Sequence, residues 1–192
     1  MLPDDRIKSM LFDYPTQIPI SAGILPAAWM KYREALDEIV HHHPALFGEQ
    51  IGQRDYDAIG PSTYVYGDHV DAWGCVWSNI KTGMEAIVTG HPAPTREAVH
   101  ALTIPEKDDG IPHGFMYLRL GDIRGFEEIM VDFAEEPPEL QMLLDKVLAY
   151  NMRQVKKRLD AATTPGQIFT FGDDLGMQAS LPISPKKWRK FL

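Results

Sequence analysis

Short apolar runs alternate with segments of helical periodicity along this chain of 192 residues, and this alternation limits the fold more than any other feature. The expected strands cover 18–24, 62–66, 85–88, 114–120 and 167–171. The expected helices cover 27–42, 95–102, 122–133 and a long segment that begins near 135. Parallel strands need crossover connections, so the alternation predicts an α/β fold with about four β/α units. Four units are half of a (β/α)8 TIM barrel, which usually takes about 250 residues.

The composition is that of one globular domain, which we expect to span residues 1–192. Hydrophobic residues make up 44% of the chain and charged residues 24%, so a substantial core can be buried. The net charge is −8 and the pI is about 5.3. Binding to phosphate backbones needs a basic face, so this balance argues against nucleic acid as a partner.

Cysteine usage and the N-terminus favour the cytoplasm. Cys75 is the only cysteine, so no disulfide can form within the chain and no cysteine cluster can hold a metal. The first residues lack the basic and apolar regions of a signal peptide. No apolar run approaches the ~20 residues that a membrane-spanning helix needs. We therefore expect a cytoplasmic protein with no membrane partner.

Two adjacent carboxylates, Asp173 and Asp174, follow the last apolar run and precede a loop and a helix start. Acidic residues at the C-terminal end of a strand are how α/β enzymes present catalytic groups. Neighbouring residues point in opposite directions, so one carboxylate can face the barrel axis while the other caps a backbone N–H. Gln178 adds an amide to the same loop. An acidic turn without a catalytic role explains the pair about equally well.

Segment 68–77 gathers two acids, a histidine, two tryptophans and the thiol. An Asp/His pair beside aromatic walls suits the binding of a flat or apolar ligand, which makes Asp71 a catalytic candidate and Trp73 a binding candidate. Trp73 and Trp77 lie four positions apart and could equally belong to the core. Cys75 could be an inert buried thiol.

Three further residues are binding candidates. Ser21 and Gly23 stand where the first strand should end, so they could let a ligand approach closely. Arg119 ends the expected strand at 114–120 and could hold an anionic substrate group, although a salt bridge explains it equally well. Consecutive histidines at 41–43 splay around a helix end, so we assign no metal ligands in this chain.

With these residues in hand, the chain resembles the uroporphyrinogen decarboxylase superfamily, which includes cobalamin-linked methyltransferases that act on methanol, methylamines and methoxylated compounds. The segment 18–26 occupies the first-strand position, and Asp71-x-Trp73-Gly74 resembles the family's Asp-x-Trp-Gly segment. Segment 114–126 resembles the third unit. Phe171-Gly-Asp-Asp-Leu-Gly-x-Gln, then Ser184-Pro-x-x-Trp-Arg, resembles the fourth strand and its helix. The resemblance implies the N-terminal half of a barrel, cut in the helix after the fourth strand.

The resemblance also implies a branch of the family. Decarboxylases carry an Arg-Gln-Ala-Gly-Arg segment after the first strand, whereas this chain has Ser21-Ala-Gly-Ile-Leu-Pro26 there. Without that arginine clamp a polyanionic tetrapyrrole would be held poorly, which favours the methyltransferase side and a corrinoid protein as partner. Zinc in that branch is held by His and Cys of the second half, so no cofactor is expected in this half.

Three functions therefore stand as hypotheses. The first is methyl transfer from a small methylated or methoxylated donor. The second is decarboxylation of a tetrapyrrole carboxylate, which needs no cofactor. The third is a non-catalytic half-barrel that closes its sheet with a second half or with a second copy as a homodimer.

Overall fold

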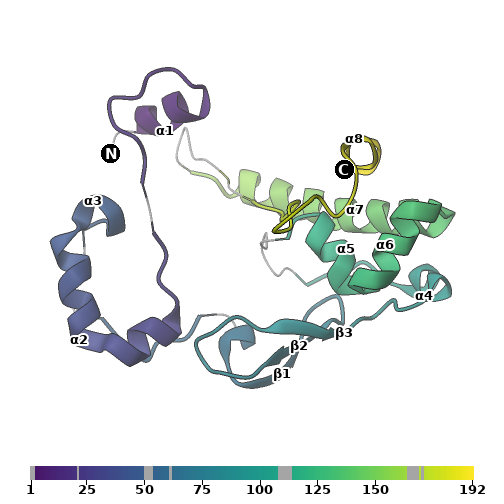
Figure 1. Ribbon diagram of the computed structural model, residues 1–192, viewed down its shortest axis with the longest axis horizontal. Helices are drawn as coiled ribbons and strands as arrows, with labels where there is room; N and C mark the ends of the chain where they lie inside the picture. The colour runs from purple at the N-terminus through teal and green to yellow at the C-terminus, as the bar shows by residue number, and fades with distance from the viewer. Residues whose placement is uncertain are drawn as a thin grey trace. The chain divides into compact units, whose positions relative to one another are not determined.

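The computed structural model describes residues 3–20, 22–49, 54–60, 62–107, 114–163, 169 and 171–192, and Figure 1 shows their elements. The helices are α1 (Pro3–Met10), α2 (Pro26–His42), α3 (Pro44–Phe47), α4 (Arg96–Ala101), α5 (Tyr117–Arg124), α6 (Phe126–Glu135), α7 (Pro138–Asp160) and α8 (Pro185–Phe191). A short 3-10 helix, η1, covers Ser62–Tyr64. The strands are β1 (Gly67–Val70), β2 (Val76–Asn79) and β3 (Ile87–Gly90).

The predicted half of a (β/α)8 barrel is wrong. Over the described ranges, the three strands form one sheet in the order β1-β2-β3, and β2 pairs with β3 in antiparallel orientation. A barrel of this kind needs parallel strands that alternate with helices, yet no helix stands between these consecutive strands. The fold is instead a mixed α/β arrangement of helices with one small antiparallel sheet.

The segment that misled the prediction most is 114–120, which reads as a strand and is mostly helix. Gly114 adopts φ +85, a conformation that favours glycine, and α5 begins three residues later. Leucine and arginine are good helix formers, so the composition of Leu118–Arg119–Leu120 permits either state. The carboxylate of Asp173 decides between them, because it accepts backbone N–H groups at the start of α5. That contact joins positions 55 to 57 apart in the sequence, where no local pattern can reveal it.

Among the described residues, one of the other expected strands is displaced and the rest are absent. Segment 62–66 contains η1, and the strand expected at 85–88 lies two positions later as β3. The described residues of 18–24 contain no strand. In the expected last strand, 167–171, only Phe169 and Phe171 belong to the described residues, and neither is in a strand. The helix expected over 122–133 is divided between α5 and α6 by Gly125, which has φ +94.

The helices expected over 27–42, over 95–102 and from near 135 are confirmed as α2, α4 and α7, because local signals specify them, although Arg33 interrupts α2 with non-helical backbone angles. Pro26 occupies the first turn of α2, as its missing N–H allows. Thr95 caps α4 by accepting the N–H of Ala98 at 3.3 Å. The apolar stripe from Leu140 onward forms the buried face of α7. None of the helices in the described part of the chain is long and apolar enough to cross a membrane.

The chain divides into two compact units. Unit 1 consists of Met1–Gly67 with Asn79–Ala86, and unit 2 consists of Asp68–Ser78 with Ile87–Leu192. Val40 is the one buried hydrophobic side chain among the described residues of unit 1. The main core lies in unit 2, where α7 contacts α4, α5 and α6 (Figure 1). Unit 2 therefore holds the rigid framework on which a site can be built.

Candidate functional site

Asp71 lies in the turn between β1 and β2 and organises that turn. Its Oδ1 accepts the backbone N–H groups of Trp73 and Cys75, both at 2.9 Å. Its Oδ2 accepts the indole N–H of Trp77 at 3.0 Å and a guanidinium N–H of Arg119 at 2.8 Å. With both oxygens occupied, Asp71 is an anchor of the turn and the partner of Arg119, not a free catalytic base.

Arg119 connects this turn to α5, and its side chain is only 9% exposed. Besides Asp71, it approaches the carboxylate of Asp122 at 3.7 Å, three positions along the same helix. The guanidinium of arginine is not deprotonated in proteins, so Arg119 is a fixed positive charge between these carboxylates. Of the two explanations that the sequence left open for Arg119, the structure shows the salt bridge, because Arg119 pairs with carboxylates of the protein itself.

Asp122 is the most strongly perturbed acid of this network. Its pKa is raised to about 6, chiefly because burial disfavours the charged carboxylate. The positive charge of Arg119 works against this rise, while the negative charge of Asp71 adds to it. A carboxyl group with a pKa near neutral can both donate and accept a proton, which is the property of a general acid–base catalyst.

A cavity of about 280 Å³ adjoins Asp122 in unit 2. Its walls include Val88, His91, Tyr117, Gly121, Asp122 and Phe126. The Nδ1 of His91 lies 2.8 Å from the backbone carbonyl of Asp122. Because a carbonyl oxygen only accepts, the neutral ring carries its proton on Nδ1 and keeps Nε2 as an acceptor. The cavity therefore combines apolar and aromatic walls with a carboxyl group and an imidazole, the composition expected of a small-molecule site.

Asp173 lies in the same unit but is fully engaged with backbone. Its Oδ2 accepts the N–H groups of Met116 at 2.7 Å and Tyr117 at 2.5 Å, and its Oδ1 accepts that of Leu118 at 2.9 Å. Asp174, next in the chain, is exposed. The prediction that one of the two carboxylates caps backbone N–H groups thus describes Asp173, both of whose oxygens accept backbone N–H groups.

The remaining sequence-based candidates do not join this cavity. Trp73 is 5% exposed and packs edge-to-face on Tyr150 in the core, with ring centroids 5.2 Å apart. Gln178 is exposed, and so is Gly23, which belongs to unit 1. Ser21 lies outside the described residues. Of the predicted set, the structure brings together Asp71, Trp73, Arg119 and Asp173 in unit 2, mainly as the support of Asp122.

Sequence reasoning missed Asp122, His91 and Tyr117. The signal for Asp122 is the three-residue spacing from Arg119, which places both on one helical face. It has meaning only if Arg119 and Asp122 lie on one helix, whereas the sequence predicted a strand over 114–120 and a helix that begins at Asp122. For His91 no sequence signal exists, because its link to α5 is a backbone carbonyl 31 positions away.

The thiol of Cys75 is fully buried, and burial raises its pKa far above neutral. A thiol is nucleophilic and binds metals only as the thiolate, so Cys75 is inert at neutral pH. No three or more His, Cys, Asp or Glu side chains of the described ranges lie where they could share a metal ion. These residues do not fit a zinc centre of their own.

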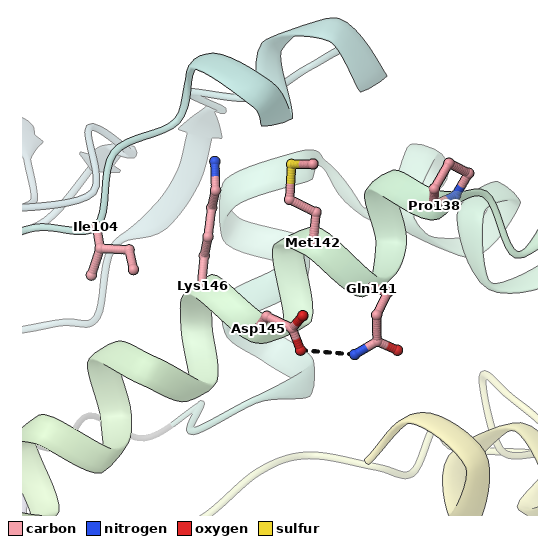
Figure 2. A pocket seen from close by; sticks show the side chains of 6 residues that line it. All are labelled: Ile104, Pro138, Gln141, Met142, Asp145 and Lys146. Carbon is pink, nitrogen blue, oxygen red and sulfur yellow. Dashed lines mark hydrogen bonds between the residues drawn. The ribbon is translucent and has the colours of Figure 1, made fainter.

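A second cavity, of about 560 Å³, lies beside α7 and the chain after α4. Figure 2 shows its lining side chains, with Lys146 extended toward the end of α4 and Asp145 bonded to Gln141. The ammonium of Lys146 donates to the carbonyls of Val99 and Leu102 at 2.6 and 2.7 Å. The two charged groups of this cavity thus have partners within the protein, and its other walls are mostly apolar.

Replacing Lys146 by methionine should lower the free energy of unfolding by about 1–3 kcal/mol, because partly buried carbonyls at the end of α4 lose their donor. Urea unfolding followed by circular dichroism measures this. The matched control is Lys156→Met, which removes only an exposed pair with Asp160. Equal effects of the two substitutions would contradict the capping role of Lys146.

Comparison with known proteins gives no match, whether to a family model, to a curated protein or to a solved structure.

Proposed function

We propose that unit 2 carries a small-molecule acid–base site in which Asp122 is the proton donor, and that its reaction is methyl transfer from a small methylated or methoxylated donor. The observation that carries the proposal is the cavity of about 280 Å³ with Asp122, pKa about 6, in its wall. A methyl group leaves a heteroatom more readily when that heteroatom is protonated, so a positioned acid is what such a donor needs.

The protonation state of Asp122 suits this role. With a pKa of about 6, roughly a tenth of the carboxyl groups hold a proton at pH 7, and more do so in mildly acidic solution. The ion pair with Asp71 at 2.8 Å holds the guanidinium of Arg119, which lies 3.7 Å from the carboxylate of Asp122. Asp122 also lines the cavity.

The proposed step is balanced in protons and electrons. Asp122 gives its proton to the donor heteroatom while the bond from that atom to the methyl carbon breaks. The electron pair of the broken bond stays on the heteroatom, which leaves as the neutral protonated product. The methyl carbon forms its new bond to a nucleophilic acceptor, for which the family resemblance suggests a corrinoid protein. Asp122 regains a proton from solvent.

Size and charge support a small donor over a tetrapyrrole. A cavity of about 280 Å³ lies at the lower edge of the range for drug-sized ligands, and a tetrapyrrole is larger than these. Asp71 and Asp122 flank the single arginine Arg119, and the negative charge of Asp173 also acts on Asp122, so this environment repels the carboxylates of a polyanionic substrate. The alternative of a half-barrel that closes with a second half requires an architecture that this fold lacks. The proposal places the reaction in the cytoplasm, where the single thiol would stay reduced.

The test is a methyl-transfer assay with the full chain, a reduced corrinoid acceptor, and methanol, methylamine and a methoxybenzene as donors, followed by the change in corrinoid absorbance. We expect Asp122→Asn to lower kcat by about 100-fold or more. We also expect wild-type kcat to fall as the pH rises through about 6, because the acid acts only in its protonated form.

The matched control is Asp160→Asn, which removes an exposed carboxylate at the end of α7 and should leave kcat unchanged. Absence of transfer from every donor would overturn the proposal. Carbon dioxide release from uroporphyrinogen in a parallel assay would favour the decarboxylase alternative instead.

A further inference from the structure

The start of α5 is held by a segment from the far end of the chain. The carbonyl of Gly172 accepts the backbone N–H groups of Gly114 and Phe115, both at 3.0 Å. The ring of Phe171 stacks on that of Phe115, with centroids 4.3 Å apart. Together with the three bonds to the Asp173 carboxylate, these contacts fasten residues 171–173 to the residues that precede and begin α5.

This attachment compensates for a missing local cap. The first N–H groups of a helix have no partner within the helix, and a polar side chain at the N-cap usually accepts one of them. Met116 occupies that position in α5 and has no side-chain acceptor. Asp173 takes its place from 55 to 57 positions away and accepts the N–H groups of three consecutive residues. Its negative charge also lies at the positive end of the helix dipole.

The helix so anchored is the one that carries the site. In its eight residues α5 contains Tyr117, Arg119 and Asp122, so a rotation or fraying of its first turn would move all three. Arg119 must stay at 2.8 Å from Asp71, and Asp122 must stay in the cavity wall. Catalytic groups need to be held within about 0.5 Å of the productive geometry, which a helix with a free first turn does not provide.

We propose that Asp173 is the positioning residue of this site: by capping α5 across the fold, its carboxylate keeps Arg119 and Asp122 in place, although it touches no reacting atom. In naming Asp122 as the group that is positioned, this inference rests on the function proposed above. This role differs from the catalytic role that the sequence suggested for Asp173. It predicts that replacing Asp173 changes the hydrogen exchange of α5 amides and the titration of Asp122, even without substrate.

The charged and titratable groups around Asp122 are Arg119 on the same helix, Asp71 and the thiol of Cys75 from the β1–β2 turn, His91 after β3, and Asp173. Burial of Asp122 is the largest single influence on its pKa. Loss of the Asp173 charge removes one like charge, and a looser first turn admits water to the carboxyl group of Asp122. Both changes favour ionisation, so the titration midpoint of Asp122 should move down.

The experiment compares the full-length wild type with Asp173→Asn and the control Asp160→Asn by NMR, without substrate. We expect hydrogen exchange at the amides of Met116, Tyr117 and Leu118 to speed up about tenfold or more in Asp173→Asn, while the amides of α7 keep their protection. We expect the side-chain titration of Asp122 to shift downward in the same variant. Asp160→Asn should change neither quantity.

Asp173→Ser is the second variant, and near-UV circular dichroism checks the fold of both. Serine is a good neutral cap, so Asp173→Ser should restore part of the amide protection. The titration midpoint of Asp122 should still be lower than in the wild type, because the charge of residue 173 is absent. If Asp173→Asn does not fold, Asp173→Ser serves as the test variant. Wild-type amide protection and an unchanged Asp122 midpoint in the folded variant would overturn the positioning role.

Kinetics separate this inference from the proposed reaction. If the wild type transfers no methyl group but the amides and Asp122 respond as expected, the proposed reaction falls and the positioning role stands. If the wild type is active and Asp173→Asn keeps the same kcat, KM and pH profile, the positioning role falls while the reaction stands.

Discussion

Replacing Asp132 by alanine is expected to lower the free energy of unfolding by about 3–5 kcal/mol, because the substitution leaves the charge of Arg124 buried without its partner. Both side chains are 2% exposed, and Asp132 Oδ2 accepts the Nε–H of Arg124 at 2.8 Å. Asp132 Oδ1 accepts the Nε–H of Arg96 at 2.8 Å, so one carboxylate joins α4, α5 and α6. The other contacts of Arg124 are backbone carbonyls and the half-exposed carboxylate of Glu128, which offset its charge only partly.

Urea unfolding followed by both far-UV and near-UV circular dichroism measures this loss in unit 2. The matched control is Asp160→Asn, whose exposed pair with Lys156 should contribute less than about 0.5 kcal/mol. A loss of under about 1 kcal/mol for Asp132→Ala would show that Arg124 finds solvent or another acceptor, which contradicts the buried network.

Truncating Trp73 to alanine is expected to cost about 3–5 kcal/mol of stability, the range for large aromatic side chains removed from a core. Trp73 is 5% exposed and meets Tyr150 of α7 edge-to-face, so its loss opens a cavity between the β1–β2 turn and the longest helix. Trp73→Phe should cost less, because the ring contact persists. It also removes an indole N–H that is buried without a hydrogen-bond partner in the described structure.

Thermal and urea unfolding of Trp73→Ala and Trp73→Phe measure the loss of stability. The KM of each variant for the methyl donor is measured in the methyl-transfer assay proposed above. A core role predicts that stability falls while KM for the donor changes little in the folded protein. A large change in KM with unchanged stability would instead restore the sequence-based interpretation of Trp73 as a wall of the binding pocket.

The sequence predicted α2, α4 and α7 well because their signals are local. Pro26, Thr95 and the apolar stripe that begins at Leu140 act within one or two turns of where they stand. It predicted the strands poorly because short apolar runs suit a strand and a buried helix equally. Residues 117–120 of the run at 114–120 belong to α5, whose first N–H groups a distant carboxylate accepts, and without a strand there the basis for a parallel barrel is lost.

For the candidate site, too, the sequence predicted some features and not others. Asp71, Trp73, Arg119 and Asp173 could be singled out from the sequence, since acidic, aromatic and basic residues stand out in apolar surroundings. Their roles could not, because each depends on its partner. The oxygens of Asp71 and Asp173 are taken up by N–H groups, and Trp73 faces the core. The group left with a shifted pKa in a cavity wall, Asp122, carries no distinguishing pattern of its own.

By itself, then, the sequence determined the caps, the helix periodicity and the acidic balance, which are properties of neighbouring residues and of composition. Only the tertiary structure decided which carboxyl group has a raised pKa and lines a cavity. The pKa of Asp122 depends on its burial and on charges from the β1–β2 turn, the end of β3, its own helix and the segment that follows residue 170. Those segments are far apart in the chain, and packing alone brings their charges within the short range over which they act.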